Sequence, residues 1–192
     1  MKAALLVNPR AGSYREGKLN RLVAILEKIG VAVLWHRLEK GQSASEIVSE
    51  LDHRMTPLII LAAGDGTINT ALNALLQRND YSQFNVAIVP IGTANVLSME
   101  LGVDSIEKSL KAIVGGKIKK LHMGRIIAIP EDRDNSRYFM LMASAGLDSK
   151  AVSGVNEELK KKIGGFAYLY EFFKILLKKN FRQLKVSVDS QL

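Results

Sequence analysis

The sequence predicts an α/β fold, with a three-layer, Rossmann-like parallel sheet in the first part of the chain and a second, mostly β domain after it. Three observations predict this fold. Short apolar runs alternate with helical patterns over residues 1–115, as in parallel sheets that carry helices on both faces. Several of these runs lead into glycine-containing turns. After residue 116 the alternation gives way to two strand-like segments and one long helical pattern.

Local signals mark the ends of the predicted helices in the first part. Leu19 and Leu26 lie on the apolar face of the first helix, and Gly30 is placed to end it. Ser43 and Glu46 have the spacing of a capping box. The expected elements are a strand over 3–7, a helix to about 29, a strand over 31–35, a helix from 43 to about 54, a strand over 58–62, a helix to 76, a strand over 85–90, a short helix ended by Gly102, and a helix capped by Asp104 and Glu107 that runs to 115–116.

The second part has a different pattern. Residues 118–129 and 137–143 read as two strands, and the polar stretch 130–136 joins them as a hairpin loop. A helix is expected over 156–179, and a strand begins at 184–188. We therefore expect a first domain over 1–120 and an incomplete second domain with one long helix over 121–192.

Composition limits the class of protein. The chain has 192 residues, 47% of them hydrophobic and none of them cysteine, which predicts a real core without disulfides. No apolar run approaches the roughly 20 residues of a membrane span, so a cytoplasmic protein is expected. The net charge is +8, and residues 157–185 carry eight basic against three acidic side chains. Such a segment could attract nucleic acid, an anionic membrane or a phosphorylated ligand, or form a solvated helix face.

The stretch 58–76 organises the chain, because it combines a buried strand, a glycine turn and an amphipathic helix. Gly64 and Gly66 predict a tight turn whose residues can take positive φ and let a phosphate approach the backbone. The free N–H groups and the dipole of the helix start attract an anion. Asp65 would repel a bare phosphate, so its presence predicts a divalent cation or a hydroxyl donor in the same site.

Three such turns follow predicted strands: residues 8–13, 64–67 and 92–95. The carboxyl ends of parallel strands meet at one edge of the sheet, where open α/β sheets bind their ligands. The hydroxyls of Thr67 and Thr93 and the amide of Asn95 are neutral donors for phosphate oxygens. The spacing excludes both the dinucleotide fingerprint Gly-x-Gly-x-x-Gly and the Gly-Lys-Ser/Thr of a P-loop.

The sequence resembles the diacylglycerol kinase catalytic domain family, the bacterial lipid kinases that include sphingosine kinase-like proteins. The resemblance rests on five segments in order: Leu-Val-Asn-Pro-Arg-Ala-Gly at 6–12, Gly-Asp-Gly-Thr-Ile-Asn at 64–69, Pro-Ile-Gly-Thr-Ala-Asn-Val-Leu at 90–97, Ser-Ala-Gly-Leu-Asp-Ser at 144–149, and 162–170. It implies ATP-dependent transfer of a γ-phosphoryl group to a lipid hydroxyl. ATP would lie between the α/β domain and a β-sandwich-type domain.

The resemblance also implies the site residues, with ATP and Mg²⁺ as cofactors. Asp65 would be the catalytic residue and a metal ligand; it would position either the magnesium ion or the acceptor hydroxyl, and the sequence leaves both roles open. The nucleotide-binding residues would be Asn8, Gly64, Asp65, Gly66, Thr67, Asn69, Gly92, Thr93 and Asn95. For the polar members the alternative role is local capping or turn bonding. The expected partners are a lipid such as diacylglycerol and the inner membrane surface, without nucleic acid; homodimerisation is left open.

The sequence departs from the family pattern at five positions. The family often has Gly at Ala63, Glu at Thr70, Asp at Val96 and at His122, and Thr at Arg37. In the family, the catalytic acid and several magnesium ligands lie in the second domain, beyond residue 192. The chain is therefore expected to be a fragment of a longer kinase, inactive alone. The alternatives are a catalytically silent nucleotide- or lipid-binding relative and, ranked lower because an Asn-Thr-Asp-Gly segment is missing, an NAD kinase.

Overall fold

The computed structural model describes residues 1–127 and 136–143. The chain divides into two compact units, Met1–Leu141 and Met142–Leu192, and nearly all described residues belong to the first. The expected element at 144–149, the helix over 156–179, the strand at 184–188 and the basic segment 157–185 lie outside the described residues. The boundary near residue 120 stays a prediction.

The first unit is built on a four-stranded parallel sheet in the order β2-β1-β3-β4. The strands are β1 (Lys2–Val7), β2 (Ala32–Arg37), β3 (Leu58–Ala63) and β4 (Asn85–Pro90). All six residues of β3 are buried, as expected of a central strand with helices on both faces. The predicted α/β class, parallel sheet and four strand positions are confirmed, with β2 and β3 extending one or two residues further than expected.

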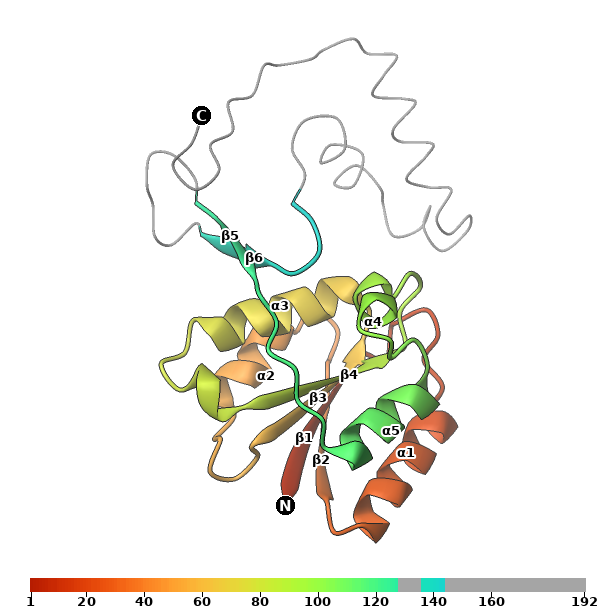
Figure 1. The fold of residues 1–192 in the computed structure, drawn as a ribbon. Coiled ribbons are helices and arrows are strands. Elements are labelled where there is room, and N and C mark those ends of the chain that lie inside the picture. The colour runs from red at the N-terminus through yellow and green to blue at the C-terminus, as the bar shows by residue number, and fades with distance from the viewer. Residues whose placement is uncertain (128–135, 144–192) are drawn as a thin grey trace, which may run out of the picture. The chain divides into compact units, whose positions relative to one another are not determined.

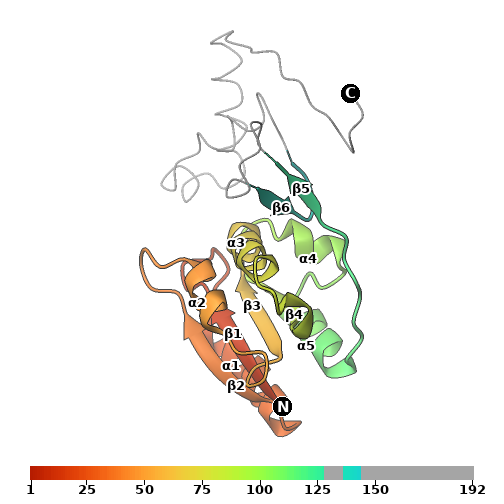
Figure 2. The same cartoon turned by 90° about the vertical axis from the view of Figure 1, so that its left-hand side faces the viewer.

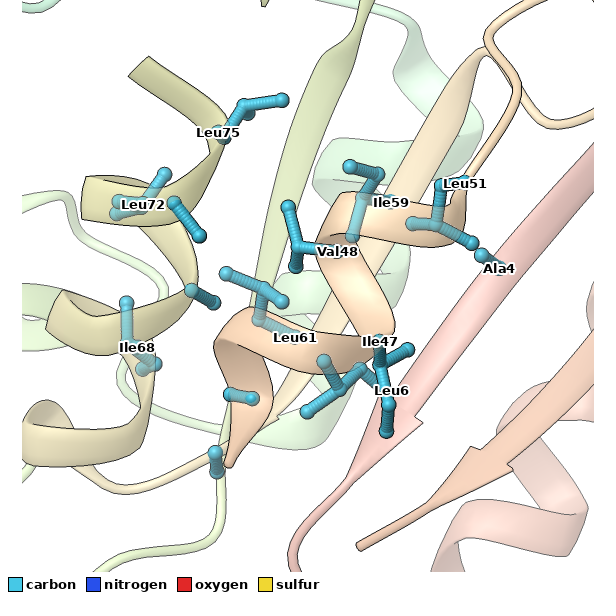
Figure 3. Packing of buried hydrophobic residues seen from close by; sticks show 14 of the residues in the cluster. Ala4, Leu6, Ile47, Val48, Leu51, Ile59, Leu61, Ile68, Leu72 and Leu75 are labelled. Atoms are coloured by element: carbon cyan, nitrogen blue, oxygen red, sulfur yellow. The ribbon is translucent and has the colours of Figure 1, made fainter. Parts of the chain in front are cut away.

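Helices cover both faces of the sheet, so the unit has three layers (Figure 1). On one face lie α1 (Glu16–Lys28) and α5 (Ile106–Gly115), and on the other lie α2 (Ala44–Glu50) and α3 (Asp65–Leu76). Two buried clusters fill the spaces between the layers. In the cluster under α2 and α3, apolar side chains of both helices pack on those of β1 and β3, as Figure 3 shows for Ile68, Leu72, Val48, Ile59 and Leu61.

The ends of α1 and α2 show how the local signals operate. Gly30 takes φ +82°, and its N–H and that of Val31 donate to carbonyls of the last turn of α1, as predicted. The capping box of Ser43 and Glu46 is present. The prediction that this helix reaches residue 54 is wrong: it ends at Glu50, because Asp52 begins a turn in which its carbonyl accepts N–H bonds from residues 55 and 56.

The remaining helices are η1 (Tyr81–Gln83), a 3-10 turn, and α4 (Val96–Glu100), with Gly102 at φ +73° after it. At α5 the predicted cap Asp104 is wrong. Ser105 is the N-cap and its hydroxyl accepts from the Lys108 N–H, while Asp104 forms an ion pair with the Lys108 ammonium. A hydroxyl one residue closer to the helix satisfies the free N–H better than the carboxylate.

The last described elements form a short antiparallel hairpin, β5 (Gly124–Ile126) with β6 (Arg137–Phe139), which lies beside α3 (Figures 1 and 2). The predicted pair of strands is confirmed, but both predicted lengths are wrong. Residues 117–122 are extended and exposed without strand pairing, because no described strand lies beside them. The hairpin contacts α3 and belongs to the first compact unit, Met1–Leu141.

Candidate nucleotide site at the carboxyl edge of the sheet

The three predicted turns meet at one edge, as the parallel sheet requires. They follow β1, β3 and β4, which are neighbours in the sheet, and the strand order reverses between β1 and β3. Backbone hydrogen bonds join them: the Asn8 N–H donates to the Ala62 carbonyl (3.1 Å) and the Ser13 N–H to the Ile91 carbonyl (2.8 Å). This is the position at which open α/β sheets bind ligands.

Glycines allow the second and third turns to touch. A Cβ built on Gly92 would lie 2.5 Å from the Gly64 Cα and 2.7 Å from the Asn95 Oδ1, so any side chain at Gly92 would separate the turns. Neither glycine has positive φ, and Gly64 is the N-cap of α3 at φ −91°. The expected use of left-handed backbone at residues 64–67 is therefore wrong. Close approach is the reason for Gly64 and Gly92.

The predicted turn at 64–67 is the start of α3 itself. Asp65, Gly66 and Thr67 form its first turn, and none of their N–H groups finds an acceptor among the described residues. The α3 helix has 12 residues, so its N-terminus carries the dipole and free N–H groups of an anion site. Asn8 donates from Nδ2 to the Thr67 Oγ1 at 2.9 Å and accepts the Arg10 N–H, which fixes the first turn beside the second.

The Asp65 carboxylate lies between the second and third turns. It accepts the N–H groups of Val96 (3.2 Å, to Oδ2) and Leu97 (3.1 Å, to Oδ1), and so caps the N-terminus of α4. No cation among the described residues forms an ion pair with it. A carboxylate has about four acceptor positions, so two remain for a metal ion or a hydroxyl. Asp65 is thus bound to the protein and still able to bind a cation.

The third turn is held by its own side chains. Asn95 adopts the left-handed region at φ 54°, accepts the Gly92 N–H at 2.8 Å and donates to the Gly92 carbonyl at 3.1 Å. Ser13 donates from its hydroxyl to the same carbonyl at 3.1 Å. The amide of Asn95 therefore shapes the turn, which is the alternative role that the sequence left open. Thr93 is exposed, and its Oγ1 lies beside Gly12.

The structure thus sorts the predicted residues into two groups. Asn8, Asp65 and Asn95 have hydrogen-bonded side chains: those of Asn8 and Asp65 tie neighbouring turns together, and that of Asn95 holds its own turn. Free groups for a ligand are the first-turn N–H groups of α3 and the exposed hydroxyl of Thr93. Asn69 is exposed one turn further along α3, away from the three turns in sequence.

Two features were not predicted. Asn73 of α3 is buried and hydrogen-bonded to β6; a polar residue beside the apolar stripe was the available signal. A polar pocket of about 400 Å³ is lined by residues from the start of α2, from α3 and from β6. Its lining residues are Ser43, Ser45, Asn69, Thr70, Asn73, Ala74, Gln77 and Arg137.

The positions that depart from the family pattern have local roles. Ala63 is fully buried, and Thr70 bonds back to the Gly66 carbonyl at 3.1 Å. Arg37 pairs with Glu16 and stacks on Trp35. Among residues 1–127 and 136–143, no group of three or more His or acidic side chains has the arrangement of a metal site. Magnesium at Asp65 would therefore need further ligands from a phosphate, from water or from other residues.

Comparison with known proteins agrees with this geometry. The family model "Diacylglycerol kinase catalytic domain" matches residues 2–126. The chain is 31% identical over 143 residues to the probable lipid kinase YegS of Salmonella heidelberg (strain SL476), covering 74% of the chain and 44% of that relative. It is also 31% identical over 142 residues to the probable lipid kinase YegS-like of Enterobacter sp. (strain 638), covering 73% and 44%.

Solved structures give the same picture. A diacylglycerol kinase from Bacillus anthracis str. Sterne matches with a TM-score of 0.56 at 28% identity, over 72% of this chain and 47% of that one. The chain therefore spans less than half the length of the curated relatives that it matches. No helix in the described part of the chain has the length and apolar character needed to cross a membrane.

Proposed function

The chain belongs to the diacylglycerol kinase catalytic domain family, and from this we propose that it is the nucleotide-binding part of a lipid kinase that transfers the γ-phosphoryl group of ATP to a lipid hydroxyl. The observation that carries the proposal is the first turn of α3. Its N–H groups have no acceptor among the described residues, and they face the edge where three turns converge. The family and this geometry support the same ligand class.

The residues present fit a nucleotide with magnesium. The N–H groups of residues 65–67 would hold phosphate oxygens at the positive end of the α3 dipole. Thr93 offers an exposed hydroxyl donor. Asp65, whose carboxylate keeps two acceptor positions and no cationic partner among the described residues, would hold magnesium or the acceptor hydroxyl. Bound ATP and magnesium would supply the phosphoryl group and neutralise its charge.

The chain's own groups would act by positioning. Phosphoryl transfer depends mostly on alignment and on fixed charges rather than on covalent catalysis by the protein. The Asn8–Thr67 bond and the Asp65–Leu97 bond fix the three turns before a ligand arrives, so little reorganisation is needed. Among the described residues, Asp65 is the carboxylate that bonds across the second and third turns, where it would orient the attacking hydroxyl if it does not hold the metal.

A second candidate is a catalytically silent nucleotide-binding relative. The observation that favours it is the capping of α4: both Asp65 oxygens already accept N–H groups, and Thr70 stands where the family often has Glu. A carboxylate engaged in capping has fewer acceptor positions left for a metal ion or a hydroxyl.

A phosphate-transfer assay separates the two candidates. Because the 192-residue chain is expected to be inactive alone, the assay uses a longer chain that contains it, incubated with radiolabelled ATP, magnesium and diacylglycerol in mixed micelles, alongside the Asp65→Asn variant and a control variant, Gln77→Leu. The lipid kinase proposal expects labelled lipid with the chain and the control, and a loss of at least about 100-fold with Asp65→Asn, the scale of losing a base or a metal ligand. ATP binding without labelled lipid would favour the silent relative, and neither binding nor transfer would reject both.

A further inference from the structure

One polar side chain of α3 lies buried outside the three turns. Asn73 has 8% of its surface exposed, while its neighbours Leu72 and Ala74 belong to the apolar cluster between α3 and the sheet. A buried carboxamide lowers stability unless its donors and acceptor are satisfied. Its bonds therefore show what the residue is for.

The carboxamide of Asn73 pairs with the backbone of a single residue in β6. Nδ2 donates to the Tyr138 carbonyl at 3.0 Å, and the Tyr138 N–H donates to Oδ1 at 2.8 Å. The second hydrogen of Nδ2 goes to the Asn69 carbonyl at 2.9 Å. Both hydrogens of the Asn73 amide are therefore used. Towards Tyr138 the side chain offers one donor and one acceptor side by side, as the backbone of a neighbouring strand would.

This pairing lies on the free edge of the hairpin. Tyr138 lies opposite Arg125 of β5. The N–H and C=O groups of Tyr138 both bond to Asn73, so Tyr138 and Arg125 form a cross-strand pair that is not hydrogen-bonded to each other. Each strand of the hairpin has three residues. Two-stranded hairpins of this kind are marginal by themselves, and among the described residues α3 supplies the contacts that hold this one in place.

We propose that Asn73 is a positioning residue that docks the β5–β6 hairpin on α3 by acting as a one-residue strand. The docking places Arg137, the residue before Tyr138, at the wall of the polar pocket beside Asn69. Met140 adds an apolar contact with the cluster under α3, but apolar contact sets no register. The two hydrogen bonds of Asn73 do set one.

The consequence for catalysis rests on the proposed function. Asn73 and the first-turn N–H groups of residues 65–67 lie on the same rigid helix, so the hairpin is fixed relative to the groups that would hold the phosphates. The chain continues from β6 beyond Phe139. Loss of the Asn73 bonds would leave the first turn of α3 unchanged, so ATP binding should stay intact. It would free the hairpin, and the chain that follows it, from its fixed place relative to that turn, so the rate of phosphoryl transfer should fall.

Amide hydrogen exchange on the whole 192-residue chain tests the docking directly. The variants are Asn73→Leu, which removes both bonds at similar volume, and Asn73→Asp, which keeps the shape but places a carboxylate against the Tyr138 and Asn69 carbonyls. Gln77→Leu is the matched control, because Gln77 is an exposed amide of the same pocket with no hydrogen bond to the described residues. Exchange in β3 reports whether each variant keeps its fold.

At neutral pH we expect the Tyr138 amide to exchange at least about tenfold faster in both Asn73 variants than in the wild type, the ratio for one lost hydrogen bond of ordinary strength. Exchange in β3 and in the Gln77→Leu chain should not change. Unaltered Tyr138 exchange in Asn73→Leu would overturn the proposal. So would wild-type protection in Asn73→Asp, since the donor would then be unnecessary.

The micelle assay adds a readout that a purely structural residue would not give. Asn73→Leu should keep the wild-type dissociation constant for ATP and lose about tenfold or more in turnover, while Gln77→Leu keeps both. Equal turnover in the wild type and Asn73→Leu would overturn the positioning role and leave the lipid kinase proposal standing. A wild type that binds ATP but transfers nothing rejects the lipid kinase proposal, and the exchange experiment still decides the docking.

Discussion

At the carboxyl end of the sheet Asp65 accepts hydrogen bonds only from backbone N–H groups, whereas at the amino end the Asp80 carboxylate pairs with the side chains of Arg78 and His53. Arg78 forms two bonds of 2.8 Å to the Asp80 carboxylate, and His53 Nδ1 lies 2.9 Å from it. Arg78 also donates to the Val48 and Ser49 carbonyls at the end of α2. One end neutralises its charges internally, and the other leaves a carboxylate and several N–H groups for a ligand.

The difference shows that the two ends of the sheet have different roles: side-chain bonds at the amino end stabilise the fold, and the carboxyl end keeps groups that could bind a ligand. The Arg78 bonds hold the Asp80 pKa well below its usual range, and the Asp80 bond raises the pKa of Arg78, so both stay charged. Arg78 lies over the Phe84 ring, and His53 packs edge-on against it. That end is a closed structural network. The carboxyl end is ordered by glycine contact and short turns, and its unused donors are the basis for the function proposed.

The largest effect is expected from Gly92→Ala, which attacks the contact between the turns. The new Cβ would meet the Gly64 backbone at 2.5 Å, so the turns must move apart. We expect a loss of about 3 kcal/mol in the free energy of unfolding, as for other overpacked sites, and loss of ATP binding. Urea unfolding and calorimetric titration measure the two. Gly66→Ala is the control, because its Cβ has no neighbour within 4 Å, and it should be at least as stable as wild type.

Arg78→Met should remove the hydrogen-bond network at the amino end of the sheet and leave the turns at the carboxyl end unchanged. It removes the bonds to Asp80 and to the two carbonyls at the end of α2, while keeping much of the apolar volume. The expected loss is about 2 kcal/mol in the free energy of unfolding, measured in urea, since hydrogen bonds to charged groups are stronger than neutral ones. ATP affinity should stay at the wild-type value. A drop in affinity of the folded variant would mean that the two ends are coupled.

Asp65→Ala should cost less stability than Arg78→Met. The carboxylate acts on α4 as an N-cap does, and removing such a cap costs about 1 kcal/mol. Thermal and urea unfolding would measure the change. Stability that rises on this substitution would show that the uncompensated negative charge outweighs the capping bonds.

The smallest effect concerns pH. Because the folded pKa of Asp80 is depressed, its contribution to stability is fully present above its unfolded value near 3.8 and is lost as the pH falls through the lower folded value. The stability difference between the wild type and Asp80→Asn should shrink as the pH falls from about 5 to below about 4. Urea unfolding over this range measures it. A difference that grows with acidity would contradict the ion pair.

Much of the fold was predictable because it depends on local patterns. The apolar run at 58–63 and the cap at Ser43 act within a few residues, so the strand and the helix start could be read directly. The end of α2 could not, because it depends on the turn that begins at Asp52. The strand lengths after 117 depend on which backbone finds a partner, which no local pattern specifies.

At the site, residue types were predictable and their bonds were not. Glycines and hydroxyls after strands indicated turns that meet at one edge of the sheet, and the structure brings those turns together. Asp65 caps α4 by accepting the N–H groups of Val96 and Leu97, which lie 31 and 32 positions later in the chain. Asn73 contacts Tyr138 across 65 positions. Such pairings follow from the packed fold: the sequence marks Asn73 as a polar residue beside an apolar stripe, but no local pattern identifies its partner.

The central claim is that the carboxyl-edge turns bind ATP with magnesium, and isothermal titration of the chain tests it most directly. ATP with magnesium is titrated into the wild type, Asp65→Ala and Asp80→Asn, with circular dichroism to confirm that each is folded. We expect saturable binding at millimolar ATP or below in the wild type and Asp80→Asn, and at least about tenfold weaker binding in Asp65→Ala, equivalent to about 1.4 kcal/mol. No heat of binding in well-folded wild type, or equal affinity in all three proteins, would contradict the account.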